Sequence, residues 1–141
     1  MPVNLANEIL TILESQENPK ILILGYSYKA NVGDTRETPV KPLSFHLKEY
    51  GCEVIIHDPL VEKDEIPDEM IVVADPTKCE DLDLIILATS HEEYSFSNRD
   101  FWTSISSSMK KPIIFDGRRT LPKNKMQDSG WVYYGVGSPH P

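Results

Sequence analysis

Hydrophobic residues along the chain occur in two patterns: short continuous runs, and positions that repeat every three or four residues. The continuous runs are typical of strands that are buried on both faces of a parallel sheet. They predict six strands, the third of them the weakest, at residues 20–25, 53–58, 70–73, 83–89, 111–117 and 131–135. Because these strands are apolar at nearly every position, we expect helices to cover both faces of their sheet.

Helical spacing of apolar residues falls before and between these strands. It predicts helices at residues 5–14, 39–50 and 98–109. The second helix has Thr38 as a suitable N-cap and Pro39 at its first position. The alternation of strands and helices predicts a single α/β domain, Rossmann-like and doubly wound, with a mainly parallel sheet of about six strands. Ligands of such a sheet bind beyond the carboxyl ends of its strands.

Composition narrows the class of protein further. The chain has 141 residues, of which 40% are hydrophobic, as one compact domain with a buried core requires. Its 22 acidic and 14 basic residues give a net charge of −8, which disfavours nucleic acid and membrane surfaces as partners. The acidic residues are concentrated at positions 49–83, which we interpret as a solvated acidic face.

Neither a targeting segment nor a reactive cysteine is expected. No apolar run approaches the roughly 20 residues of a spanning helix, and the N-terminus lacks the pattern of a secretory signal. A cytoplasmic location is therefore expected. Cys52 and Cys79 lack the spacing of metal ligands, so we interpret them as inert thiols and expect no metal site.

The loop after the first strand, residues 25–39, carries the candidate chemistry. Lys29 and Arg36 precede a helix start, whose unpaired N–H groups and partial positive charge favour a phosphate. An anionic ligand is therefore indicated. The alternative is that Asp34, Arg36 and Glu37 pair with one another at a solvated turn, and the spacing alone leaves both interpretations open.

This loop does not carry the dinucleotide fingerprint. Ser27 and Ala30 stand where G-x-G-x-x-G has its later glycines, so an NAD pyrophosphate cannot approach the backbone in the usual way. Asp58 ends the second strand, where a Rossmann fold places its ribose acid. Without the glycines we interpret Asp58 as a turn-forming residue before a proline.

Three motifs follow one another at plausible spacing along the chain. They read Gly25-x-x-Tyr28-Lys29-x-Asn31-x-x-Asp34-Thr35-Arg36-Glu37-Thr38-Pro39, then His57-Asp58-Pro59, then Phe115-Asp116-Gly117-Arg118. Together they resemble the C-terminal domain of the UDP-glucose and UDP-N-acetylmannosamine dehydrogenase family. The resemblance implies that residues 20–141 form a UDP-binding domain and that residues 1–19 end a linker helix from a central dimerisation region.

In the family that the motifs resemble, an N-terminal Rossmann domain binds NAD and a central region carries a catalytic Cys and Lys. The C-terminal domain closes over the UDP-sugar, whose C6 alcohol is oxidised to a carboxylate. The resemblance implies that this chain has no catalytic residue of its own and is inactive alone. Its implied partners are a UDP-sugar and the remaining domains of the same polypeptide, in a homo-oligomer.

The resemblance also implies roles for individual residues. Tyr28 and Lys29 match an aromatic-Lys pair that contacts the UDP-sugar, and Arg118 matches another substrate-binding residue. Arg36 matches a residue that reaches NAD held by another domain. For Arg119 we favour a solvated or structural role.

Thr89-Ser90-His91 resembles the family's Thr-x-His stretch, and we interpret His91 as a capping or interface residue. Two rival functions are kept beside the family. One is a free-standing nucleotide-sugar-binding or regulatory module without catalysis. The other is a receiver-like signalling domain, which ranks low because residues 25–28 hold none of the acids that it needs.

Overall fold

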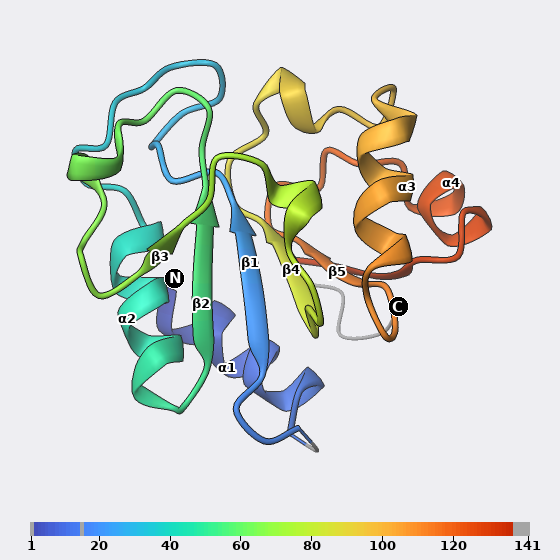
Figure 1. The fold of residues 1–141 in the computed structure, drawn as a ribbon, viewed down its shortest axis with the longest axis horizontal. Coiled ribbons are helices and arrows are strands. Elements are labelled where there is room, and N and C mark those ends of the chain that lie inside the picture. The colour runs from blue at the N-terminus through green and yellow to red at the C-terminus, as the bar shows by residue number, and fades with distance from the viewer. Residues whose placement is uncertain (1, 15, 137–141) are drawn as a thin grey trace.

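A computed structural model describes residues 2–14 and 16–136 of the chain. Its centre is a sheet of six parallel strands in the order β3-β2-β1-β4-β5-β6 (Figure 1). The strands are β1 (Lys20–Leu24), β2 (Glu53–His57), β3 (Ile71–Val72), β4 (Leu84–Leu87), β5 (Ile113–Asp116) and β6 (Val132–Gly135). The expected doubly wound, Rossmann-like α/β domain is confirmed.

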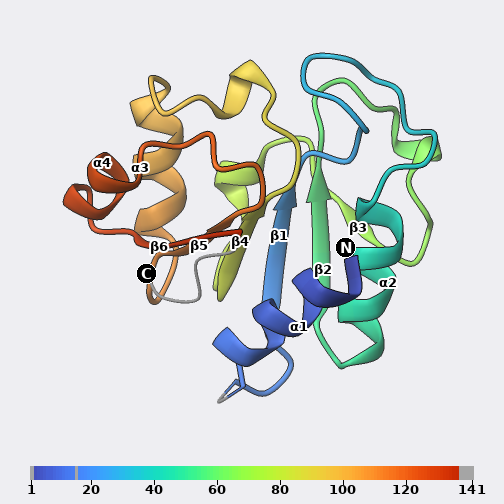
Figure 2. The ribbon, with the colours of Figure 1, turned by 180° about the vertical axis from the view of Figure 1, so that it is seen from behind.

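Helices cover both faces of this sheet. They are α1 (Pro2–Ile12), α2 (Val40–Glu49), α3 (Arg99–Ser107) and α4 (Lys123–Asp128). Figure 2 shows α1 and α2 in front of one face, while α3 and α4 lie beside the other. Three short 3₁₀ segments occupy loops, namely η1 (Lys63–Glu65), η2 (Pro76–Lys78) and η3 (Glu92–Tyr94).

The alternation of side chains along β1 builds the two halves of the core. Ile21 and Ile23 belong to the apolar cluster under α1 and α2, whereas Leu22 and Leu24 belong to the cluster under α3. All four are fully buried. Full burial of each such side chain contributes about 1.5–3 kcal/mol, so a run of apolar residues is what a strand between two helix layers requires.

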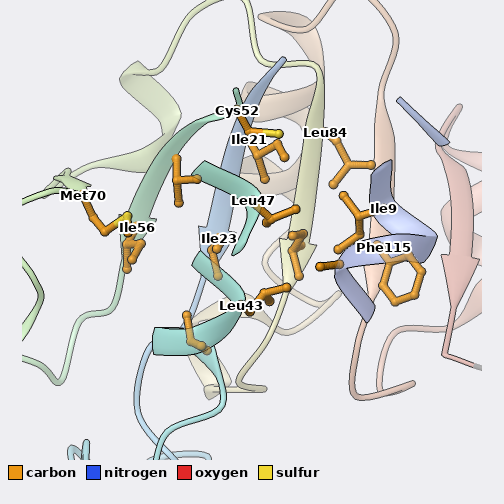
Figure 3. Packing of buried hydrophobic residues seen from close by; sticks show 14 of the residues in the cluster. Ile9, Ile21, Ile23, Leu43, Leu47, Cys52, Ile56, Met70, Leu84 and Phe115 are labelled. Carbon is orange, nitrogen blue, oxygen red and sulfur yellow. The ribbon is translucent and has the colours of Figure 1, made fainter. Parts of the chain in front are cut away.

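Helix α1 is packed into the same core as the sheet. Ile9 on this helix is fully buried beside Leu43 and Leu47 of α2, and Figure 3 shows it close to Leu84 and Phe115. The assignment of residues 1–19 to a linker helix remains a prediction.

The observed elements differ from the predicted ones mainly at their ends. Helix α2 begins at Val40 rather than Pro39, because the Thr38 hydroxyl accepts the Val40 N–H and Pro39 takes the N-cap position. Helix α4 was not predicted at all. Only Met126 of this helix is buried, so its sequence has no apolar stripe from which a pattern could be read.

The acidic stretch at residues 49–83 lies mostly in solvent, as expected. Asp83 is half-buried, and its carboxylate accepts the Lys20 N–H at 2.8 Å. Asp58 is the one fully buried acid among these residues. The stretch is therefore a solvated face with one acid turned inward.

Gly25 ends β1 in a conformation that other residues rarely adopt. Its φ is +97°, and its N–H donates to the His57 carbonyl at 2.7 Å. A Cβ at this position would lie 2.4 Å from the Thr89 Cβ and 2.7 Å from the Thr89 backbone nitrogen. The close approach of two backbone segments therefore requires a glycine.

We expect Gly25→Ala to lower the free energy of unfolding by more than about 2 kcal/mol, because the left-handed conformation alone costs about 1–2 kcal/mol and the overlap adds to it. Gly130→Ala is the matched control. Gly130 has a φ of +95°, but no atom lies within 4 Å of its Cβ position, so a loss of about 1 kcal/mol is expected. Urea denaturation of the two variants measures the difference, and equal losses would contradict the steric argument.

Candidate functional site

The candidate site lies at the carboxyl edge of the sheet. Because all strands are parallel, the loops that follow β1, β2 and β4 gather at the arrowhead end in Figure 1. Strands β1 and β4 are neighbours in the sheet although β2 and β3 lie between them in the sequence. The chain thus reverses its direction of winding here, which is where sheets of this kind bind ligands.

Asp58, at the end of β2, is a buried carboxylate at this edge. Its Oδ2 accepts the N–H groups of Tyr26 at 2.7 Å and Ser27 at 2.9 Å, and its Oδ1 accepts the Leu60 N–H at 2.8 Å. Burial alone would raise the pKa of Asp58, but hydrogen bonds from these N–H groups and from His91 outweigh it, so the pKa lies below its usual value. The carboxylate therefore remains ionised while it holds the first loop.

His91 completes the contacts of this carboxylate. Its side chain is fully buried, with Nε2 2.9 Å from Asp58 Oδ2 and 3.1 Å from Ser27 Oγ. Its Nδ1 accepts the Asn31 N–H at 2.8 Å, which assigns the ring proton to Nε2. The Asn31 side chain in turn accepts the Glu92 N–H at 2.9 Å. We refer to Ser27, Asn31, Asp58 and His91 as the Asp58 network.

His91 occupies the N-cap position of η3, as a capping role predicts, although its side chain makes no capping hydrogen bond there. The alternative of an interface residue is corrected, because the side chain is buried inside the domain. Asp58 is confirmed as a turn-forming residue through its bond to Leu60. The contacts between the loops after β1, β2 and β4 were not foreseen, because they join residues about 30 to 60 positions apart.

Tyr94, in η3, makes a second buried contact between loops. Its hydroxyl donates to the His57 carbonyl at 2.9 Å and lies 2.8 Å from His57 Nδ1. Burial raises the pKa of Tyr94 and lowers the pKa of His57. Both side chains are therefore neutral, and they tie η3 to the end of β2.

Asp116 organises the loop after β5 in a similar way. Its Oδ1 accepts the Arg118 N–H at 3.0 Å, while Oδ2 accepts the Leu121 N–H and the Tyr133 hydroxyl, both at 2.8 Å. The carboxylate is fully buried. The backbone of residues 117–121 is therefore fixed, and the Arg118 side chain is left exposed.

Three of the four predicted ligand residues lie in solvent at this edge with their charged or polar groups available. Lys29 and Arg118 are exposed, and 48% of Tyr28 is exposed. Neither cation forms a salt bridge with any residue in the described ranges 2–14 and 16–136. Both can therefore offset the charge of an anion.

Arg36, the fourth, is paired within its own loop. Its guanidinium donates to both oxygens of Asp34, at 3.0 and 2.8 Å. These hydrogen bonds lower the pKa of Asp34 to about 2. The alternative interpretation of this loop was that Asp34, Arg36 and Glu37 pair with one another. The pair of Asp34 with Arg36 is observed. Arg119 donates to the Val136 carbonyl at 2.7 Å, which supports the structural role expected for it.

The start of α2 is a poor phosphate site, contrary to expectation. The Val40 N–H donates to the Thr38 hydroxyl at 3.2 Å, Pro42 has no N–H, and the Leu43 N–H donates to the Pro39 carbonyl at 3.2 Å. Three of the first four helical positions thus have no N–H to offer. Binding of an anion is left to the side chains of the loops.

The same edge does not fit an NAD molecule held by this domain. The Asp58 side chain is fully buried and both of its oxygens already accept protein donors, so the carboxylate is not accessible to a ribose hydroxyl. The Ser27 N–H donates to Asp58 instead of facing a pyrophosphate. The missing glycines of the fingerprint and the occupied acid lead to the same conclusion.

An open groove of about 720 Å³ lies beside the Asp58 network, between η3 and the start of α4. Asn31 and His91 line one side of it, and Arg99 and Lys125 lie among its other lining residues. Tyr28, Lys29, Arg36 and Arg118 do not line this groove. The predicted ligand residues therefore lie on open surface rather than in this groove.

Two further expectations concern metals and membranes. Among residues 2–14 and 16–136, no group of three or more His, Cys, Asp or Glu side chains could hold a metal ion. Within the same ranges, no helix has both the length and the apolar composition that a membrane crossing requires. Burial raises the pKa of the thiols of Cys52 and Cys79, as expected for unreactive cysteines.

Comparison with known proteins shows which family the chain resembles in sequence. The family model described as the UDP-glucose/GDP-mannose dehydrogenase family, UDP binding domain, matches residues 22–123. A UDP-N-acetyl-D-mannosamine dehydrogenase of Methanococcus aeolicus is 33% identical over 114 residues, which cover 81% of this chain and 25% of the relative. A UDP-glucose 6-dehydrogenase of Rickettsia conorii is 32% identical over 143 residues, which cover 97% of this chain and 32% of the relative.

A solved structure that resembles this chain also belongs to a dehydrogenase of this kind. The UDP-D-ManNAc dehydrogenase of Pyrococcus horikoshii is 27% identical and superposes with a TM-score of 0.76, over 99% of this chain and 31% of that one. The chain thus spans about a quarter to a third of the length of the dehydrogenases that it matches.

For Asp58→Asn we expect a loss of about 2–3 kcal/mol in unfolding free energy at pH 7, because the variant removes a charged acceptor of buried N–H groups. The pKa of Asp58 is lowered on folding, so its contribution is present above the usual carboxyl pKa of about 3.9 and disappears as the pH falls through the folded value.

The difference between wild type and Asp58→Asn should therefore shrink below about pH 4. Urea denaturation at pH 7 and pH 3 measures it. Asp68→Asn is the control, since that carboxylate is exposed on the same acidic stretch. If Asp58→Asn lowers the unfolding free energy by the same amount at both pH values, the charge of Asp58 does not stabilise the fold.

Proposed function

Because this chain belongs to the UDP-glucose/GDP-mannose dehydrogenase family, as its UDP-binding domain, we propose that Lys29 and Arg118 bind the diphosphate of a UDP-sugar. The observation that carries this proposal is the placement of two exposed cations, with no salt bridge to any residue in the part of the chain that the structure describes, on loops that follow β1 and β5 at one edge of the sheet. Arg118 can offer a diphosphate two parallel hydrogen bonds, and Lys29 adds a second positive charge.

We assign Tyr28 a contact with the same ligand. Its half-exposed ring is next to Lys29 in the sequence, on a loop whose backbone is fixed at Ser27 and Asn31. An aromatic ring that is anchored by its backbone can pack against a base or a sugar at little entropic cost.

For the complete protein we propose an NAD-dependent UDP-sugar 6-dehydrogenase, which oxidises the C6 alcohol of a UDP-hexose to a carboxylate. The relatives that support this proposal are named as dehydrogenases, and this chain matches only part of each of them. NAD would be held by another domain of the polypeptide, since the edge of this sheet does not fit it. Arg36 would reach that NAD once its pair with Asp34 opens.

Two further proposals come from the same resemblance, namely a homo-oligomeric complete enzyme and residues 1–19 as the end of a linker. A location in the cytoplasm is proposed from the sequence pattern alone. A module without catalysis is not favoured, because the matching family and relatives are dehydrogenases. The family match also removes the receiver-like alternative.

We expect UDP to bind the 141-residue chain, and Lys29→Ala and Arg118→Ala each to weaken binding by about tenfold, as the loss of one charged contact of about 1.4 kcal/mol implies. The double variant should lose less than the sum, because both cations act on one diphosphate. Arg118→Lys should also weaken binding, since it keeps the charge but loses the planar fork. Calorimetric titration measures all four.

Lys111→Ala is the matched control for that titration. This exposed cation lies just before β5, at the end of the strand opposite to Arg118, so its loss should leave UDP affinity unchanged. Added salt should weaken wild-type binding. Equal effects of Lys111→Ala and Arg118→Ala would mean that only net charge matters, and the assigned site would be wrong.

The isolated chain should form no NADH from NAD and UDP-glucose or UDP-N-acetylmannosamine, because it lacks a fitted cofactor site and its two cysteines are buried. Arg36→Ala should leave the UDP affinity of this chain intact. In the full-length enzyme the same change should raise the KM for NAD. NADH fluorescence and steady-state kinetics are the measurements. NADH production by the wild-type chain would overturn the proposal that NAD binding and catalysis belong to other domains.

A further inference from the structure

We propose that His91 is a positioning residue for the UDP-sugar site: it holds the segment 26–31 in the conformation that presents Tyr28 and Lys29 to the ligand. This inference rests on the proposed function, because it takes Lys29 as a ligand residue. His91 itself does not need to touch the ligand.

The contacts of the imidazole ring carry this proposal. Through Nε2 the ring bonds to Asp58 Oδ2, which also accepts the N–H of Ser27. Through Nδ1 it accepts the N–H of Asn31. One buried ring therefore fixes the backbone on both sides of residues 28–30, of which Tyr28 and Lys29 are exposed and Ala30 is half-buried.

Other bonds between the loops strengthen the same arrangement. The Thr89 hydroxyl donates to the Ser27 carbonyl at 2.8 Å, and the Asn31 side chain accepts the Glu92 N–H. Asn31 has a φ of +61°, a conformation in which asparagine is better tolerated than most residues. Segment 89–92, after β4, thus acts as a support on which segment 26–31 lies.

A nucleophilic role for these residues is excluded by the geometry. Ser27, His91 and Asp58 are the residue types of a catalytic triad, but serine and aspartate both lie at Nε2. In a triad the base uses one nitrogen for each partner. Here Nδ1 accepts a backbone N–H, so neither nitrogen can take a proton from a substrate, and all three side chains are buried.

A positioning role predicts a change in affinity of a definite kind. If the ligand binds only when segment 26–31 is ordered, the apparent Kd rises in inverse proportion to the ordered fraction. A variant that orders the segment in roughly one molecule out of ten should therefore bind UDP about tenfold more weakly.

The experiment compares three variants of the 141-residue chain by UDP calorimetry and urea denaturation. His91→Phe keeps the buried ring without its hydrogen bonds and should weaken UDP binding by about tenfold. His91→Gln keeps one donor and one acceptor and should recover part of the lost affinity. Tyr94→Phe removes a buried hydrogen bond that the same loop makes to the end of β2, without touching segment 26–31, so it should lower stability while leaving UDP affinity unchanged.

Should His91→Phe fail to fold, Asn31→Gly tests the same support from the surface. Glycine keeps the left-handed backbone and the N–H that His91 accepts, but it removes the bond to Glu92, so UDP binding should weaken. Asn18→Gly is the matched control, because Asn18 also has a positive φ of 48° and precedes β1 at the opposite edge of the sheet.

Trypsin cleavage after Lys29 gives a readout that does not depend on UDP. His91→Phe should speed this cleavage, while cleavage after the exposed Lys110 stays unchanged. The inference is overturned if His91→Phe leaves both affinity and Lys29 cleavage as in wild type, or if Tyr94→Phe weakens UDP binding equally. Failure of the wild-type chain to bind UDP would overturn the proposed function alone, and the cleavage rates would still decide the positioning role.

Discussion

The buried carboxylate of Asp58 is the constraint on which the carboxyl edge of this domain depends. A charge that is removed from water is tolerated only when its lone pairs are taken up by donors. Those donors come from three loops: Tyr26 and Ser27 after β1, Leu60 after β2 and His91 after β4. Satisfying one side chain therefore fixes three loop backbones relative to one another, and the positions of Tyr28 and Lys29 follow from that.

Asp116 holds the loop after β5 in the same way as Asp58 holds the loop after β1. At this edge the buried acids therefore fix the loops, and the exposed bases remain accessible to a ligand. The acids accept backbone N–H groups of their own domain, and because both side chains are buried they are not accessible to a ligand. The bases, Lys29 and Arg118, lie on the loops that the acids hold. In a chain of net charge −8, these two exposed cations form no salt bridge within residues 2–14 and 16–136, so their charges can interact with an anionic ligand.

Much of the fold could be read from the sequence, because apolar runs report burial directly. The run in β1 predicted a strand between two helix layers, and Ile21 and Leu22 do face opposite cores. The Asp58 network could not be read, since polar residues joined over about 30 to 60 positions leave no period in the sequence. For the same reason the sequence did not show that His91 bonds to Asp58 and Asn31. Helix α4 buries only Met126 and was missed on the same grounds.

The sequence did anticipate that this Rossmann-like sheet lacks a dinucleotide cradle, and the structure supplies the physical reason. An acid at the end of the second strand indicates ribose binding only while its oxygens are free. Here the backbone N–H groups of Tyr26 and Ser27 both donate to Asp58, so the loop after β1 turns these donors toward the buried acid rather than toward a pyrophosphate. The Rossmann-like architecture is therefore kept, while the loop that binds NAD in other such sheets is held here by a buried carboxylate of its own domain.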